Sequence, residues 1–101
     1  MPAAARLGDP ITTGHACDGT STIAVTGNLQ SKVIINNIIA AVIGDPIAPH
    51  TILEGDICVP HSATVVGASE KVFFENKRAA RVTDDADGGT ITEGSLDVII
   101  G

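Results

Sequence analysis

The chain has 101 residues, of which 44% are apolar and only 2% aromatic, and its formal net charge is −6. This length suits one domain spanning residues 1–101. An acidic chain without Trp or Tyr lacks both the positive surface and the stacking aromatics that nucleic-acid binding requires, so we expect no nucleic-acid partner.

β-Branched residues dominate the apolar composition, with thirteen Ile, nine Val and ten Thr against four Leu. Such side chains pack well on a pleated surface and lose rotamer freedom in helices. No segment shows the sustained 3.6-residue apolar period of a capped helix. The longest apolar run, residues 33–43, is interrupted by two asparagines and is too short to cross a bilayer. The sequence therefore predicts an all-β protein.

An internal repeat begins in the first third of the chain. Residues 32–45 align without a gap on residues 71–84, and each copy predicts a strand, a tight turn, a strand and a polar stop. Asn36 and Asn37 suit the positive φ angles of a hairpin turn, and residues 76–77 are expected to form the turn of the second copy.

Two half-copies flank the full repeats. Residues 5–10 match residues 41–46, and residues 93–101 match residues 66–74. The chain thus begins and ends in mid-unit, and pairing of its two ends would complete a third hairpin-like element. We predict a small, compact domain of three β-hairpin repeats related by pseudo-threefold symmetry.

Loops rich in Gly, Pro, Thr and Asp lie between the hairpins, and loops of this length are uncommon unless something organises them. They are expected at residues 12–19, 46–60 and 84–94. The first two loops carry both cysteines and, with the residue that follows the second loop, all three histidines.

These histidines and cysteines point to a metal site. Cys58 and His61 form a Cys-x-x-His pair, a spacing with which a tight turn can aim a thiolate and an imidazole at one ion. Three imidazoles and one thiolate fill a tetrahedral zinc shell and leave no open position, as in structural sites. An ion would also stabilise a small chain that is poor in large core side chains. We predict that His15, His50, Cys58 and His61 bind a structural zinc ion.

Other interpretations of the same residues stay open. Cys17 could supply the thiolate in place of Cys58, or lie buried as a small apolar residue. With two cysteines and no apolar leader, we expect thiols or metal ligands rather than a disulfide framework. If water held the fourth position, the chain would be a small zinc hydrolase with a three-His site. A third interpretation is an acidic β-domain with incidental histidines.

The remaining polar motifs predict no catalytic residues. The acidic segment 84–89 lacks the glycine and glutamate register of an EF-hand loop, so we expect a solvated acidic turn. Glu54 and Asp56 lie in no predicted pocket. The basic cluster in residues 77–81 is expected to be solvated or to lie at the rim of a protein contact.

Several motifs occur together in one known family. Residues 1–9, followed by Gly14-His15-x-Cys17, resemble its opening; residues 79–82 (Ala-Ala-Arg-Val) resemble its later repeat, and residues 94–101 its closing segment. This combination, which covers essentially the whole chain, resembles the PAAR-repeat family. The chain departs from the family pattern at the middle motif, residues 38–41, and at the second hairpin turn.

The resemblance implies a small conical β-structure that caps a trimeric spike in a contractile injection machine, such as a phage tail or a type VI secretion system. It implies a non-enzymatic, membrane-puncturing tip with its base on the blunt β-helical end of the spike, one tip per trimer. The zinc ligands implied by position are again His15, His50, Cys58 and His61. We expect transient contact with the target membrane and a possible effector or cargo chain.

The resemblance also sets an expectation for where the protein is found. The first six residues of the chain lack the apolar core of a signal peptide. We therefore expect a protein that is made in the cytoplasm and assembled into the tip of a phage tail or injection apparatus. With no toxin-like extension in the 101 residues, we expect a bare tip.

Overall fold

The computed structural model describes residues 2–15 and 17–101, and within them it contains ten short strands and no helix. Met1 and Ala16, which belong to the opening motifs, lie outside the described residues. The all-β prediction is confirmed. The strands are β1 (Pro10–Thr12), β2 (Thr20–Thr22), β3 (Ile34–Ile35), β4 (Ile38–Ile39), β5 (His50–Glu54), β6 (Ile57–His61), β7 (Phe73–Phe74), β8 (Lys77–Arg78), β9 (Asp85–Ala86) and β10 (Gly89–Thr90).

Consecutive strands pair as antiparallel two-stranded sheets, from β1 with β2 to β9 with β10. The β3–β4 turn falls at Asn36 and Asn37, whose φ angles are 54° and 64° as a tight hairpin turn requires. The β7–β8 turn falls at Glu75 and Asn76, one residue earlier than predicted. This position preserves the 39-residue spacing of the repeat, and it places an asparagine, which tolerates the left-handed region well, second in both turns.

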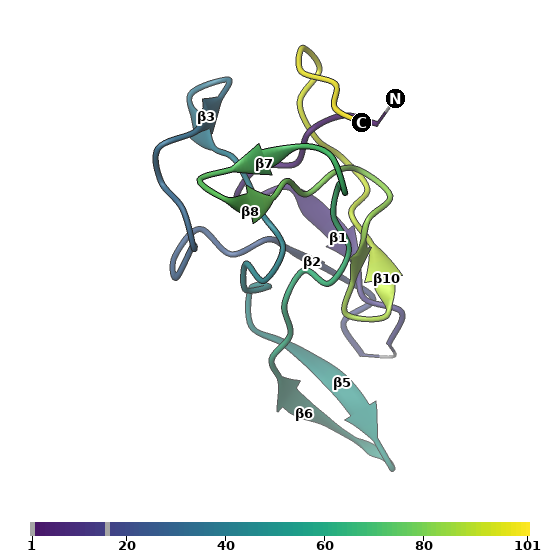
Figure 1. Ribbon diagram of the computed structural model, residues 1–101. Coiled ribbons are helices and arrows are strands. Elements are labelled where there is room, and N and C mark those ends of the chain that lie inside the picture. Colours follow the sequence, from purple (N-terminus) through teal and green to yellow (C-terminus); the bar gives the residue numbers. More distant parts are fainter. Residues whose placement is uncertain (1, 16) are drawn as a thin grey trace.

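The longest hairpin is β5–β6, which pairs five residues of each strand from His50↔His61 to Glu54↔Ile57. Most of the predicted loop 46–60 is therefore strand, turning at Gly55, where φ is 64°. In Figure 1 this hairpin extends away from the body, on the side opposite β3, β7 and the two termini. It gives the molecule its long dimension, since the principal extents are 41 × 25 × 22 Å.

Backbone hydrogen bonds that recur three times hold the body together. Ala5 N–H donates to Ala80 O, Ala80 N–H to Ala41 O and Ala41 N–H to Ala5 O, each at 3.0 Å, so the three alanines close a ring. All three are fully buried. Small side chains let the three segments approach this closely, and larger ones would overpack the ring.

Each of these segments continues into a tight turn that ends at a buried aspartate. The aspartate carboxylate accepts a hydrogen bond from the backbone N–H three residues earlier, in the pairs Arg6–Asp9, Val42–Asp45 and Arg81–Asp84. Outside the turns, three isolated bridges link the same units, namely Ile11↔Ile91, Ile23↔Ile47 and Val65↔Ala86. A turn that is capped and bridged in this way occurs three times along the chain.

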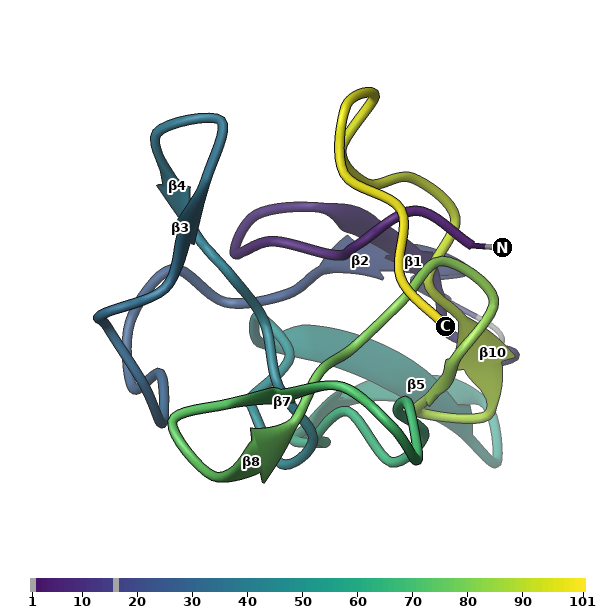
Figure 2. The ribbon, with the colours of Figure 1, turned by 45° about the horizontal axis from the view of Figure 1, so that its top comes forward.

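Two apolar clusters pack the body, and the larger contains the three ring alanines. The larger includes Leu7, Ile11, Ile23 and Ile91, and the smaller includes Ile35 and Ile100. The chain ends meet beside the smaller cluster, where Ala3 bridges Ile99 and Ile100 N–H donates to Pro2 O at 2.9 Å. Figure 2 shows the β3–β4 hairpin, the β7–β8 hairpin and the yellow C-terminal loop as three separate projections from the body.

Candidate metal centre

Three histidines reach one place from two parts of the chain. His15 lies in the loop after β1, while His50 begins β5 and His61 ends β6 as its directly paired partner. Opposed residues of an antiparallel pair project to the same face, so the pairing brings these two imidazoles together. The ring centroids of His50 and His61 are 5.3 Å apart, and those of His15 and His61 are 5.2 Å apart.

The three imidazoles converge on the carboxylate of Asp87. Oδ1 lies 2.9 Å from His15 Nε2 and 2.7 Å from His61 Nε2, and Oδ2 contacts His50 Nε2. The side chains of Asp87 and His50 are 5% and 3% exposed, whereas about a third of each of the other two imidazoles is open to solvent. One carboxylate thus contacts the Nε2 atom of every histidine in the chain.

The third loop brings Asp87 to this position through close backbone contacts. Asp87 has φ 52° in the β9–β10 turn. A Cβ atom at Gly89 would lie 2.0 Å from Thr12 O, and one at Gly14 would lie 2.4 Å from Gly88 O. Glycine is therefore required where the turn packs against the loop that carries His15.

The second nitrogen of His50 is also engaged, because Nδ1 lies 2.9 Å from Ala48 O. A carbonyl oxygen can only accept, so Nδ1 carries a proton, and Nε2, which contacts the Asp87 carboxylate, has to give up its own proton before it can offer a lone pair to an ion. Burial opposes the charged form of His50, but the hydrogen bonds with Ala48 and Asp87 outweigh it and raise the pKa of this imidazole. Burial likewise opposes the charge of Asp87, yet hydrogen bonds from His61, His15 and His50 lower the pKa of its carboxyl group.

The ligand atoms of His15, His61 and Asp87 all lie within 4.8 Å of one another, so this group could hold a metal ion. His50 Nε2 contacts the same carboxylate and adds a third imidazole. Imidazole nitrogens and a carboxylate oxygen are ligands that zinc and other first-row transition metals accept. The hydrogen bond from His50 Nδ1 to Ala48 O lies outside the ligand set, and a bond of this kind orients a metal-binding imidazole.

The prediction for Cys58 must be corrected, because the structure joins it to Cys17 in a disulfide across 41 residues of sequence. A disulfide sulfur has no thiolate to offer, so neither cysteine is a ligand in this structure. The Cys-x-x-His spacing fails for a further reason: Cys58 and His61 lie on one extended strand, where residues three apart point to opposite faces. The expectation of free thiols was wrong for the same pair.

Asp87 was missed because the acidic segment was interpreted as a solvated turn. Asp84 and Asp87 are both nearly buried, and Asp84 pairs with Arg81 at 2.7 Å. The signal available in the sequence was the alignment of Asp84 with Asp45, since the latter ends a repeat unit and is followed by a histidine loop. The loop after Asp84 carries Asp87 at a shorter offset, three residues on, where His50 follows Asp45 by five, so the alignment points to the loop and not to the residue.

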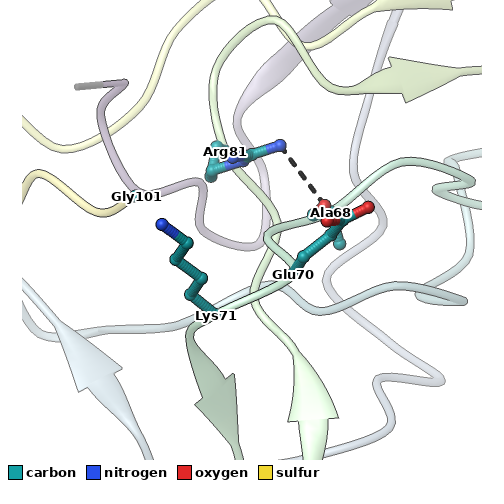
Figure 3. Close-up of a pocket in the computed structure, with 5 residues that line it drawn as sticks. All are labelled: Ala68, Glu70, Lys71, Arg81 and Gly101. Carbon is teal, nitrogen blue, oxygen red and sulfur yellow. Dashed lines mark hydrogen bonds between the residues drawn. The ribbon is translucent and has the colours of Figure 1, made fainter.

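A pocket of about 370 Å³ lies elsewhere, lined by Ala68, Glu70, Lys71, Arg81 and Gly101. Figure 3 shows Lys71 and Arg81 facing it, with Arg81 donating to Ala68 O at 3.3 Å. None of the three histidines lines this pocket, and its arginine is already bonded to Asp84. It adds no group to the histidine cluster.

No protein-family model and no curated protein sequence matches this chain. The part of the chain that the structure describes has no helix long and apolar enough to span a membrane.

Proposed function

We propose that the chain is the non-enzymatic tip of a membrane-puncturing spike, docked on the blunt end of a trimeric β-helical partner. The observation that carries this proposal is the threefold recurrence of the body, in which the ring of Ala5, Ala41 and Ala80 links three similar capped turns. A monomer in which one capped turn recurs three times would suit a trimer, with one copy per three partner chains. The resemblance to PAAR-repeat proteins supports the same conclusion.

The end of the molecule at which the termini meet offers an apolar surface for docking. Ile34, Phe73 and Ile99 are 58%, 53% and 60% exposed, and each is paired with a residue of its neighbouring segment in the same way. Their partners, Ile39, Arg78 and Ala3, are followed at the same spacing by the three ring alanines. A threefold partner could therefore bury all three side chains with equivalent contacts.

The opposite end suits a narrow point. The β5–β6 hairpin projects from the body and ends in the exposed segment Glu54–Ile57. It is held by the disulfide at Cys58 and by the histidine cluster at its base. A disulfide persists in oxidising surroundings outside the cell, where such a tip would work in transient contact with a target membrane.

Zinc is the ion proposed for the histidine cluster, as a structural ion that ties the β5–β6 hairpin to the first loop. The close ligand atoms of His15, His61 and Asp87, with His50 on the same carboxylate, favour zinc, which takes four ligands in structural sites. The alternative hydrolase requires an open water position, and the geometry does not favour it because the Asp87 carboxylate lies against all three imidazoles. The proposed tip is assembled into a phage tail or injection apparatus and could carry an effector or cargo chain.

The docking proposal is tested with purified trimeric spike proteins from phage tails and type VI secretion systems, using native mass spectrometry and calorimetry. We expect one of them to bind a single copy of the chain per trimer. Fully burying a large apolar side chain contributes about 1.5–3 kcal/mol, so completing the burial of a half-exposed one contributes about 1 kcal/mol. Changing any one of Ile34, Phe73 and Ile99 to Asp should weaken docking by at least about fivefold, to a similar extent at each position.

The matched control is the double variant Leu53→Asp/Ile57→Asp at the other end of the molecule, where both side chains are similarly exposed. It should dock as the unchanged chain does. Absence of binding to every trimer, or loss of binding in the Leu53/Ile57 variant with retention in the three base variants, would refute the proposed orientation.

A further inference from the structure

We propose that Asp87 is the fourth ligand of the metal ion, so that the centre is a three-histidine, one-carboxylate site rather than the three-histidine, one-thiolate site expected from the sequence. The inference rests on the proposed function in one respect, namely that the cluster holds zinc. It assigns a ligand that lies outside both of the loops from which the predicted set was drawn.

The first argument is distance. In a tetrahedral zinc site with bonds of about 2.0–2.2 Å, neighbouring ligand atoms are about 3.4 Å apart. Asp87 Oδ1 lies 2.9 Å from His15 Nε2 and 2.7 Å from His61 Nε2. These two donor pairs thus need to separate by only about 0.5–0.7 Å to admit the ion between them. His50 Nε2 contacts Oδ2 of the same carboxylate and lies outside the group of atoms within 4.8 Å of one another, so it would have to move closer to complete the set.

The second argument is that the backbone holds the carboxylate in place. The β9–β10 turn packs against the first loop with no room for a Cβ atom at Gly89, and a Cβ atom at Gly88 would lie 3.1 Å from Thr13 O. Asp87 is 5% exposed, so its carboxylate cannot leave the imidazoles without a large movement of the turn. A ligand that is positioned before the ion arrives loses little conformational freedom on binding.

The third argument is the state of the two cysteines. Cys17 and Cys58 are bonded to each other, and Cys58 lies opposite Leu53 on the hairpin, three register positions from the His50↔His61 pair. The ion and the disulfide are therefore two separate clamps on the same hairpin. The ion joins His50 and His61 to the first and third loops, while the disulfide joins the middle of the hairpin to Cys17.

The test uses zinc competition titrations and the absorption spectrum of the cobalt(II)-loaded chain. Asp87→Asn should weaken zinc binding by about 100-fold or more, whereas Asp85→Asn, at the exposed first residue of β9, should change it less than threefold. The double variant Cys17→Ser/Cys58→Ser should also retain zinc within threefold. Neither the oxidised nor the reduced chain should show thiolate-to-cobalt charge transfer.

A second variant, read by the appearance of a new cobalt absorption band, tests the proposal even if Asp87→Asn fails to fold. In the background without native cysteines, Asp87→Cys should introduce a thiolate-to-cobalt charge-transfer band, because it places sulfur in the fourth position. The proposal is overturned if Asp87→Asn folds and retains its zinc affinity, if Asp87→Cys shows no such band while binding cobalt, or if reduction of the native disulfide produces one. Spike docking, measured on the same variants, separates this outcome from failure of the proposed function, because the docking residues lie at the far end.

Discussion

Replacing both cysteines by serine removes the Cys17–Cys58 cross-link, and the chain length that this bond spans gives the expected cost. The disulfide closes a loop with a sequence separation of 41 residues. In the chain-entropy treatment, closing such a loop restricts the unfolded chain and stabilises the fold by about 4 kcal/mol at 25 °C. For a domain of this length, each kcal/mol corresponds to about 4–8 °C in Tm, so Cys17→Ser/Cys58→Ser should melt about 16–32 °C lower.

The same measurement in zinc and in chelator separates two roles of these cysteines. The disulfide acts on the unfolded chain, whereas the ion binds only the folded one, so the cost of the double substitution should be the same in both conditions. Urea denaturation followed by circular dichroism gives the two free energies of unfolding. A cost below about 1 kcal/mol in chelator would refute the loop-closure calculation. A cost that changes by more than 1.4 kcal/mol on adding zinc would show that the cysteines act on the metal site as well.

Three further substitutions test the packing and the charge interactions. Gly89→Ala places a Cβ atom 2.0 Å from a β1 carbonyl oxygen and should lower the free energy of unfolding by about 3 kcal/mol or more. The control Gly19→Ala, for which the nearest atom is 4.0 Å from the new Cβ, should be nearly neutral. Similar melting temperatures for the two variants would contradict this. Two backbone N–H groups each donate to the buried Asp45 carboxylate at 2.8 Å, and Asp45→Ala leaves both without an acceptor. The free energy of unfolding, measured by urea denaturation, should fall by about 2–6 kcal/mol, and a loss below 1 kcal/mol would count against the argument. Hydrogen bonds from backbone N–H groups, first that of Ser31, lower the pKa of Glu75. The ionised Glu75 carboxylate therefore contributes its full stability above the unfolded pKa of about 4.3, and this contribution is lost as the pH falls through the lower folded pKa. Glu75→Gln should therefore lose less stability between pH 5 and pH 3 than the unchanged chain, and equal acid sensitivity would contradict this assignment.

Two of the three capped turns could be predicted because their determinants are local in the sequence. Two Ala-x-x-Gly-Asp segments, at residues 5–9 and 41–45, align at a fixed spacing, and the structure hydrogen-bonds Ala5 to Ala41. Small residues, a glycine with φ near 90° and a capping aspartate each fix the backbone within a few residues. The pairing of the chain ends was expected because each end carries half of a unit, but the alignment of residues 93–101 was one residue out of register, since Ile99 pairs as Phe73 does.

The histidine cluster could be predicted only in part, because its geometry depends on which residues are extended. The three histidines come together as expected, but the Cys-x-x-His spacing was interpreted for a tight turn and lies on β6 instead. Strand geometry turns Cys58 away from the imidazoles, towards the disulfide with Cys17. Asp87 depends on a long-range contact of the third loop with the first, and no local pattern specifies that contact.

The Cys17–Cys58 disulfide and the histidine–aspartate cluster both lie on the part of the molecule that lacks an apolar core. Of the ten residues in β5 and β6, only His50 is buried, and the hairpin carries the exposed apolar side chains Leu53 and Ile57. A two-stranded hairpin without a buried apolar face is marginally stable in water. The body does not need such support, because the alanine ring and two apolar clusters hold it together. The disulfide and the histidine–aspartate cluster are thus located where hydrophobic burial is least, and a metal ion there would add rigidity to the longest hairpin of the fold.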